Sequence, residues 1–184
     1  MTHNFLSDLG GYESRSGSVN FLSAFFFNTS MFLFLSVGIG FLLVPRLFQD
    51  DPMNYRLAIV GSIFFLLGNA FFAGVGLTPH DLYLDLHLFF ALNAFRLLIP
   101  GSLLYLIVLL RSPVKNHYAL VTMFYLISTV AYVIYQLTNG SVFDSQEEMV
   151  RQATIQKLIA LASVVTIFSL SFAFASQLKN LDLS

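Results

Sequence analysis

The segment Thr78-Pro79-His80-Asp81-Leu82-Tyr83-Leu84-Asp85-Leu86-His87 carries two imidazoles and two carboxylates within eight residues. Such side chains can hold a divalent metal ion or serve as general acids and bases. His80, Asp81 and His87 are therefore candidates for metal ligands, although their spacing matches no compact metal motif. In the structural alternative, Asp81 caps a following helix and Asp85 lies in its first turn. We expect no resident cofactor beyond this possible metal.

Arg96 is the one charged residue within a long apolar run, Leu88–Leu110. A charge deep in a membrane helix costs about 2.5–3.5 kcal/mol on insertion scales, normally faces the bundle interior and marks a functional site. No carboxylate lies deep enough to pair with Arg96, so its expected partners are Asn28, Asn69, Asn93 or an anionic ligand. In the alternative, Arg96 extends to the membrane surface, where asparagines and water satisfy it.

The composition requires a membrane around these residues. Hydrophobic residues make up 57% of the 184 residues and charged residues only 10%, whereas soluble domains carry about 25% charged residues. Cysteine is absent, which excludes disulfides, thiolate metal sites and cysteine nucleophiles. The net charge of -1 and the lack of basic runs favour no nucleic acid as a partner. We expect membrane lipids, and other membrane protein chains, instead.

Five stretches are long enough to cross a bilayer, which takes roughly 20 apolar residues as helix. These stretches are Phe21–Val44, Leu57–Leu77, Leu88–Leu110, Tyr118–Leu137 and Ile155–Ala175. They lack the charged face that a helix in a soluble bundle shows at a period of 3.6 residues. The sequence therefore predicts an all-α fold, a polytopic transmembrane bundle of about five spans.

The lysines and arginines of the short loops predict the orientation. Arg46 and Arg56 follow the first span, and Arg111 and Lys115 follow the third, whereas the second loop carries acidic residues only. By the positive-inside rule, the first and third loops face the cytoplasm. We therefore expect a multi-pass protein of the cell membrane with its N-terminus outside. Its parts are a polar extracytoplasmic segment (1–20), the bundle (21–178) and a short cytoplasmic tail (179–184).

Depth along the predicted spans, at 1.5 Å per residue, places a layer of polar side chains in the outer leaflet. The inner half of the bundle has no comparable set, so the layer predicts an outward-facing pocket and not a channel. The candidate ligand-binding residues of this pocket are Arg96, Asn93, Asn69, Asn28, Arg151 and Lys157. Lys157 lies close enough to the interface to reach water by itself, and Glu147 is placed to pair with Arg151 on a helix surface.

Three short segments resemble domain-of-unknown-function family 998, small multi-span membrane proteins of bacteria and archaea. These segments are Leu6-Ser7-Asp8-Leu9-Gly10 with Phe26-Phe27-Asn28, then Gly74-Val75-Gly76-Leu77-Thr78-Pro79-His80-Asp81 with His87, and last Arg151. The resemblance implies one outer site formed by Asp8, Asp81, His87 and Arg151. Family members usually have six spans, so it also implies that this chain lacks the first span, which a partner chain would supply.

Three functions follow as hypotheses. The leading hypothesis is a binding protein without redox chemistry of its own, which holds a lipid headgroup or small anionic ligand in an outward-facing pocket with Arg96 as the anion partner. The second is an accessory or structural subunit of a larger membrane complex. The third is a metal-assisted membrane lipid hydrolase, in which Asp8, Asp81 and His87 are the candidate catalytic residues.

Overall fold

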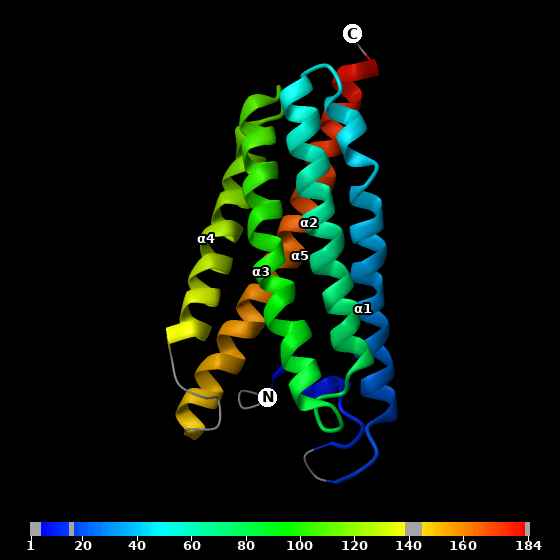
Figure 1. The fold of residues 1–184 in the computed structure, drawn as a ribbon, viewed down its shortest axis with the longest axis vertical. Coiled ribbons are helices and arrows are strands. Elements are labelled where there is room, and N and C mark those ends of the chain that lie inside the picture. Colours follow the sequence, from blue (N-terminus) through cyan, green and yellow to red (C-terminus); the bar gives the residue numbers. More distant parts are fainter. Residues whose placement is uncertain (1–4, 15–16, 139–144, 183–184) are drawn as a thin grey trace.

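The computed structural model describes residues 5–14, 17–138 and 145–182, and these residues form helices and no strands. The helices in chain order are η1 (Leu6–Gly10), α1 (Phe21–Phe41), η2 (Val44–Phe48), α2 (Pro52–Leu77), α3 (Leu84–Arg111), α4 (Asn116–Thr138) and α5 (Gln146–Asp182). The α-helices run side by side, with the start of the chain at one end of the bundle and the end of α5 at the other (Figure 1). The predicted all-α bundle of five apolar helices is confirmed.

Helices α2 and α5 begin five and nine residues earlier than hydropathy predicts, because polar residues cap them. Asp51 accepts hydrogen bonds from the N–H groups of Met53 (2.8 Å) and Asn54 (3.2 Å), and Pro52 occupies the first turn of α2. This is the preferred chemistry of a helix N-terminus. Likewise, the hydroxyl of Ser145 accepts from the N–H group of Glu148 (3.1 Å) at the start of α5.

The predicted cap of α3 is wrong. The residue that precedes α3 is Tyr83, and no side chain caps this helix. The carboxylate of Asp81 instead accepts a hydrogen bond from the backbone N–H group of Glu13, 2.9 Å away. Asp81 therefore connects the N-terminal segment to the α2–α3 loop. The acidic residue in the first turn of α3 is Asp85, as predicted.

Glycines of α2 allow its two neighbours to approach closely, the usual device of membrane helices. A Cβ atom at Gly61 would lie 3.0 Å from the ring of Tyr105 in α3, and one at Gly68 would lie 2.8 Å from Leu98. On the side that faces α1, a Cβ atom at Gly76 would lie 2.9 Å from Met31. Helix α2 is thus the packing centre for α1 and α3, while α4 joins α3 to α5.

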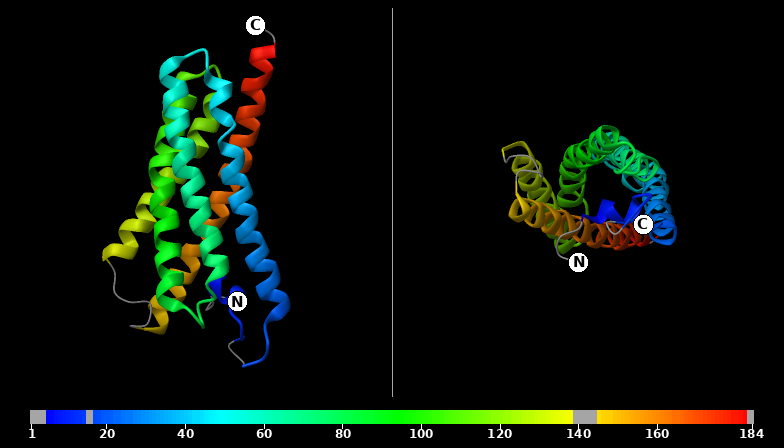
Figure 2. Two further views of the ribbon diagram at one scale, coloured as in Figure 1. Left: turned by 45° about the vertical axis from the view of Figure 1, so that its right-hand side comes forward. Right: turned by 90° about the horizontal axis from the view of Figure 1, so that it is seen from below.

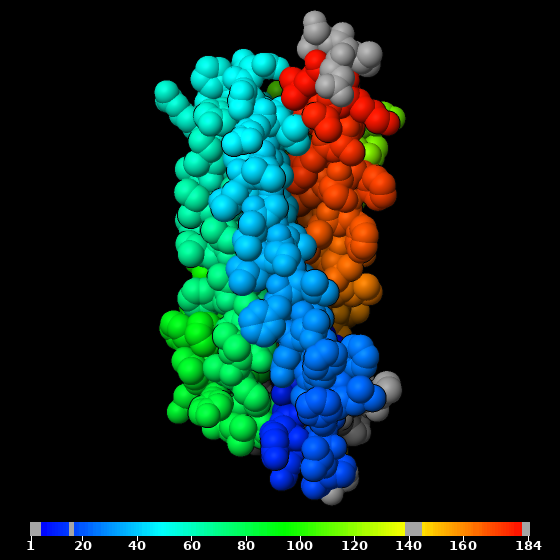
Figure 3. All heavy atoms as spheres, turned by 90° about the vertical axis from the view of Figure 1, so that its right-hand side faces the viewer, coloured from blue at the N-terminus to red at the C-terminus, as the bar shows by residue number. Residues whose placement is uncertain are grey.

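Four aromatic rings join α1, α2, α3 and α5 near the C-terminal end of the bundle. Phe41 lies 4.5 Å from Phe65, 5.4 Å from Tyr105 and 5.8 Å from Phe174 between ring centroids. This cluster brings the distant α5 against α1, and the two helices lie next to each other on one face of the molecule (Figure 3). The cluster closes the bundle at this end, and the N-terminal segment lies at the opposite end.

A buried pair of hydroxyls supports the cluster. Ser62 donates a hydrogen bond to the carbonyl of Phe41 (2.6 Å) and lies 2.7 Å from the hydroxyl of Tyr105. Because the single proton of Ser62 goes to the carbonyl, Tyr105 donates to Ser62.

Ser62→Ala is expected to cost about 1–3 kcal/mol of unfolding free energy, because it leaves two buried polar groups unpaired. Tyr105→Phe is expected to cost only about 1 kcal/mol, since Ser62 keeps its bond to the Phe41 carbonyl. Thermal unfolding in detergent of both single variants and the double variant measures the coupling. The double variant should cost less than the sum of the two, and strictly additive costs would contradict the chain of hydrogen bonds.

Candidate binding site beneath the N-terminal cap

The N-terminal segment folds over one end of the bundle, and we call residues Phe5–Ser14 the N-terminal cap. The N–H group of Leu6 donates to the side-chain carbonyl of Gln156 in α5 (3.0 Å). The carbonyl of Leu9 accepts from the hydroxyl of Ser23 (3.0 Å) and from the amide of Asn20 (3.1 Å). Because these bonds reach both α1 and α5, the cap connects the first and the last helix of the bundle. Figure 2 shows η1 inside the ring of helices, seen from below.

Two glycines let the cap lie close to the helices. Gly10 is buried, and a Cβ atom there would collide with the ring of Phe27 and lie 3.0 Å from the side-chain oxygen of Asn28. A Cβ atom at Gly11 would lie 3.0 Å from the imidazole of His80 and 3.3 Å from the carboxylate of Asp81. A side chain at Gly10 would therefore force Phe27 or the cap to move, and one at Gly11 would crowd His80 and Asp81.

The predicted outer group of acids and imidazoles lies at the junction of the cap with the α2–α3 loop. Nε2 of His80 lies 3.6 Å from a carboxylate oxygen of Asp8, and the rings of His80 and His87 are 6.0 Å apart. His87 is buried, and its Nδ1 lies 2.6 Å from the carbonyl oxygen of Thr78. Arg151 is not part of this group, since it pairs with Glu147 one helical turn away (3.1 Å).

The contacts of this group are those of a structural junction. Asp8 accepts from the N–H group of Phe5 (3.1 Å), Asp81 accepts from Glu13, and His87 is held by Thr78. Within the described residues, no three His, Asp or Glu side chains gather at a spacing that could hold a metal ion. Catalytic roles for Asp8, Asp81 and His87 stay predictions.

The placement of Arg96 in the bundle interior is wrong. Arg96 is exposed on the outside of α3, and its guanidinium contacts only the side-chain oxygen of Asn93 (3.4 Å) among the described residues. Asn69 is buried and donates to the carbonyl of Phe65 in its own helix (2.7 Å). Asn28 lies beside Gly10 of the cap. The predicted polar layer therefore does not converge on one ligand.

A cavity of about 80 Å³ lies directly beneath the cap. Its lining comes from the cap and from α1, α2, α3 and α5: Leu6, Ser7, Phe27, Met31, Phe34, Phe72, Val75, His87, Ala91, Phe95, Gln156, Ala160 and Ser163. Polar groups stand near the cap, at Ser7, His87 and Gln156, whereas most of the lining is apolar. The cavity thus has the composition of a site for an amphiphilic molecule.

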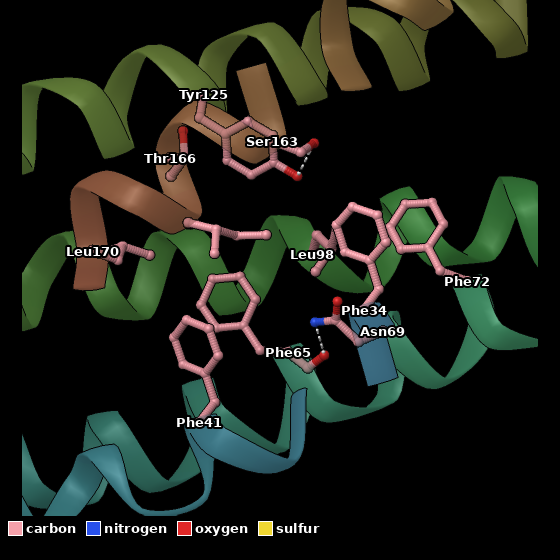
Figure 4. A pocket seen from close by; sticks show the side chains of 11 residues that line it. Phe34, Phe41, Phe65, Asn69, Phe72, Leu98, Tyr125, Ser163, Thr166 and Leu170 are labelled. Atoms are coloured by element: carbon pink, nitrogen blue, oxygen red, sulfur yellow. Dashed lines mark hydrogen bonds between the residues drawn. The ribbon is translucent and has the colours of Figure 1, made fainter. Parts of the chain in front are cut away.

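A second, smaller cavity of about 20 Å³ continues toward the aromatic cluster and shares Phe34, Phe72 and Ser163 with the first. Figure 4 shows Tyr125 and Ser163 facing the side chains of Leu98 and Phe34 across this space. Ser163 donates to the carbonyl of Ile159 (2.9 Å), and its hydroxyl lies 3.2 Å from that of Tyr125, so the polar groups at this depth are already paired. The two cavities thus share part of their walls, and both linings are mostly apolar.

Sequence reasoning missed most of this lining, because a cavity is defined by the rotation of several helices at once. One local signal was present. Leu6 and Ser7 precede a Gly10-Gly11 pair within an otherwise polar segment, the pattern of a chain that must place an apolar residue against a neighbour and turn tightly.

The five apolar helices and the interior cavity define a multi-pass helical membrane protein. Comparison with known protein families, curated proteins and solved structures finds no match. The resemblance to domain-of-unknown-function family 998 therefore stays a prediction.

Proposed function

We propose that this protein binds a single lipid molecule, of which the headgroup end and the adjoining carbon atoms enter the cavity beneath the N-terminal cap. The observation that carries the proposal is the polarity of the cavity, whose polar groups gather at the cap while its depth is aromatic. The headgroup of the lipid lies against Ser7, His87 and Gln156. The apolar chain lies between Phe34 and Phe72.

The lining favours a neutral hydroxyl-bearing headgroup over an anionic one. The lining residues include no lysine or arginine, so an anion there would lack a counter-charge. A carbonyl can only accept, so the 2.6 Å contact with Thr78 assigns the ring proton of a neutral His87 to Nδ1. Nε2 of His87 then accepts from a ligand hydroxyl.

Gln156 supplies the complementary group. Its side-chain oxygen accepts from the N–H group of Leu6, which leaves the amide nitrogen as a donor. A ligand hydroxyl can donate to His87 and accept from Gln156 at once.

The orientation that fits this function is the one expected from the loops. The basic residues Arg46, Arg56, Arg111 and Lys115 lie in loops or helix ends away from the cap, whereas Asp8, Asp81 and Asp85 lie at the cap. In our proposal the cap therefore faces the outside of the cell membrane and the cavity opens to the outer leaflet.

Filling the cavity tests the proposal. Ala160 lines the cavity in α5, whereas Ala175 of the same helix is exposed. Ala160→Phe is expected to weaken lipid binding by about 5–150-fold, because overpacking costs about 1–3 kcal/mol. Ala175→Phe is the matched control and should bind as the unchanged chain does.

Native mass spectrometry after mild detergent extraction measures the occupancy as a defined mass adduct. Equal lipid retention by the two variants would contradict a lipid in this cavity. Extraction in a fixed ratio with another chain, with no lipid adduct, would favour the accessory-subunit hypothesis instead.

A further inference from the structure

A separate, more polar cavity lies at the opposite end of the bundle, where the chain ends. It encloses about 310 Å³. Its walls come from the η2–α2 turn, the end of α3 and the end of α5: Phe48, Asp50, Asp51, Asn54, Arg111, Ser112, Pro113, Gln177, Asn180 and Leu181. Helices far apart in the sequence thus build one site.

The cation in this wall is already paired. Nε of Arg111 donates to the side-chain oxygen of Asn54 (2.9 Å), and Nη2 donates to a carboxylate oxygen of Asp51 (3.0 Å). The N–H groups of Asn54 and Met53, together with Arg111, hold the pKa of Asp51 below its ordinary value of 3.8. Asp51 is therefore charged at neutral pH and cancels the charge of Arg111.

Gln177 and Asp50 each present an acceptor that has no donor among the described residues. Gln177 is only 6% exposed, and its amide nitrogen donates to the carbonyl of Leu47 (3.1 Å). Its side-chain oxygen is buried and has no hydrogen-bond partner in the described part of the chain, an arrangement that is costly unless a ligand or water completes it. Asp50 is exposed on the same cavity, with no ion pair among the described residues.

The lining thus carries a surplus of one negative charge and of hydrogen-bond acceptors. Of its ten residues only Asp50, Asp51 and Arg111 are charged, which gives a net charge of -1. A ligand that fits must bring a positive charge and several N–H donors together. A primary ammonium group has three such donors on one cation.

We propose that this cavity binds a primary ammonium group, between the carboxylate of Asp50 and the side-chain oxygen of Gln177. By the expected orientation the cavity lies at the inner surface of the membrane. The ammonium comes either from the ethanolamine headgroup of a membrane lipid or from a free small amine. This site is separate from the lipid cavity beneath the cap and does not depend on it.

Nanodiscs that contain equal amounts of phosphatidylethanolamine and phosphatidylcholine test the lipid source. The two lipids share the phosphate and differ in the N–H groups, so a preference isolates the ammonium. The unchanged protein should retain phosphatidylethanolamine about tenfold over phosphatidylcholine, as one charge-assisted hydrogen bond provides. Native mass spectrometry reads the ratio.

Gln177→Met and Asp50→Asn should each bring the ratio toward one. Gln146→Met, at the exposed start of α5, is the matched control and should keep the preference. Asp50 is exposed, so Asp50→Asn decides the outcome even where Gln177→Met fails to fold. An unchanged ratio in Asp50→Asn would overturn the proposal for a lipid headgroup.

Phosphoethanolamine titrated into nanodiscs of pure phosphatidylcholine tests the free amine. Saturable binding that Asp50→Asn weakens about tenfold, without any lipid preference, would identify a soluble amine as the ligand. A lipid preference without phosphoethanolamine binding would identify the lipid headgroup. Equal lipid retention together with no phosphoethanolamine binding would overturn the site altogether.

Discussion

Gly68→Leu is expected to lower the free energy of unfolding by about 3 kcal/mol, the upper end of the range for overpacked interiors. Gly68 is buried where α2 crosses α3. A Cβ atom there would lie 2.8 Å from the side chain of Leu98 and 3.3 Å from the backbone oxygen of Ala94. Leu98 can rotate away, but the backbone of α3 can move only as a whole helix. The substitution therefore separates the two helices that form the centre of the bundle.

Gly40→Leu is the matched control for this packing effect. Gly40 is exposed on α1, and a Cβ atom there meets nothing within 4 Å. The Gly40→Leu variant should unfold at about the same temperature as the unchanged protein, whereas the Gly68→Leu variant should unfold at a much lower temperature. Thermal unfolding in one detergent compares the two, and equal stability of the variants would contradict the close approach of α2 to α3.

The spans were predictable because a bilayer sets their length and hydropathy. Helix α1 begins at Phe21 and α2 ends at Leu77, as the apolar runs predict. The starts of α2 and α5 were placed too late, since their first turns are polar. In those turns Asp51 and Ser145 supply capping bonds that hydropathy does not measure.

The outer group was predictable from topology alone, because Asp8, His80 and His87 precede or follow spans on the same side. The side of α3 on which Arg96 lies was not predictable. Helix α3 is apolar on both faces: Phe95 and Leu98 are buried, while Phe89 and Leu103 are exposed. A membrane helix of this kind lacks the polar face that reveals the rotation of a soluble helix. Depth therefore follows from the sequence, whereas rotation needs the packed neighbours.

Gly10→Val is expected to release the N-terminal cap while the bundle stays folded. A valine side chain would collide with the ring of Phe27 and the side-chain oxygen of Asn28. An overpacking cost of about 1–3 kcal/mol is comparable to the stabilisation that a few hydrogen bonds provide to the cap. The amide hydrogens of residues 6–10 should then exchange about 10–100-fold faster, while the amides of α2 keep their protection. Hydrogen exchange with mass spectrometry measures both, with Gly40→Val as the control.

Lipid retention by the same variant decides what the cap does for the cavity. Leu6 and Ser7 line the cavity, and the cap is fixed to α5 through Gln156. If the cap retains the lipid, Gly10→Val should release the bound lipid faster in step with the faster exchange of the cap. Retention at the rate of the Gly40→Val control, with the cap released, would show that His87 and the aromatic walls hold the lipid by themselves. Unchanged exchange in Gly10→Val would instead contradict the packing of the cap on Phe27.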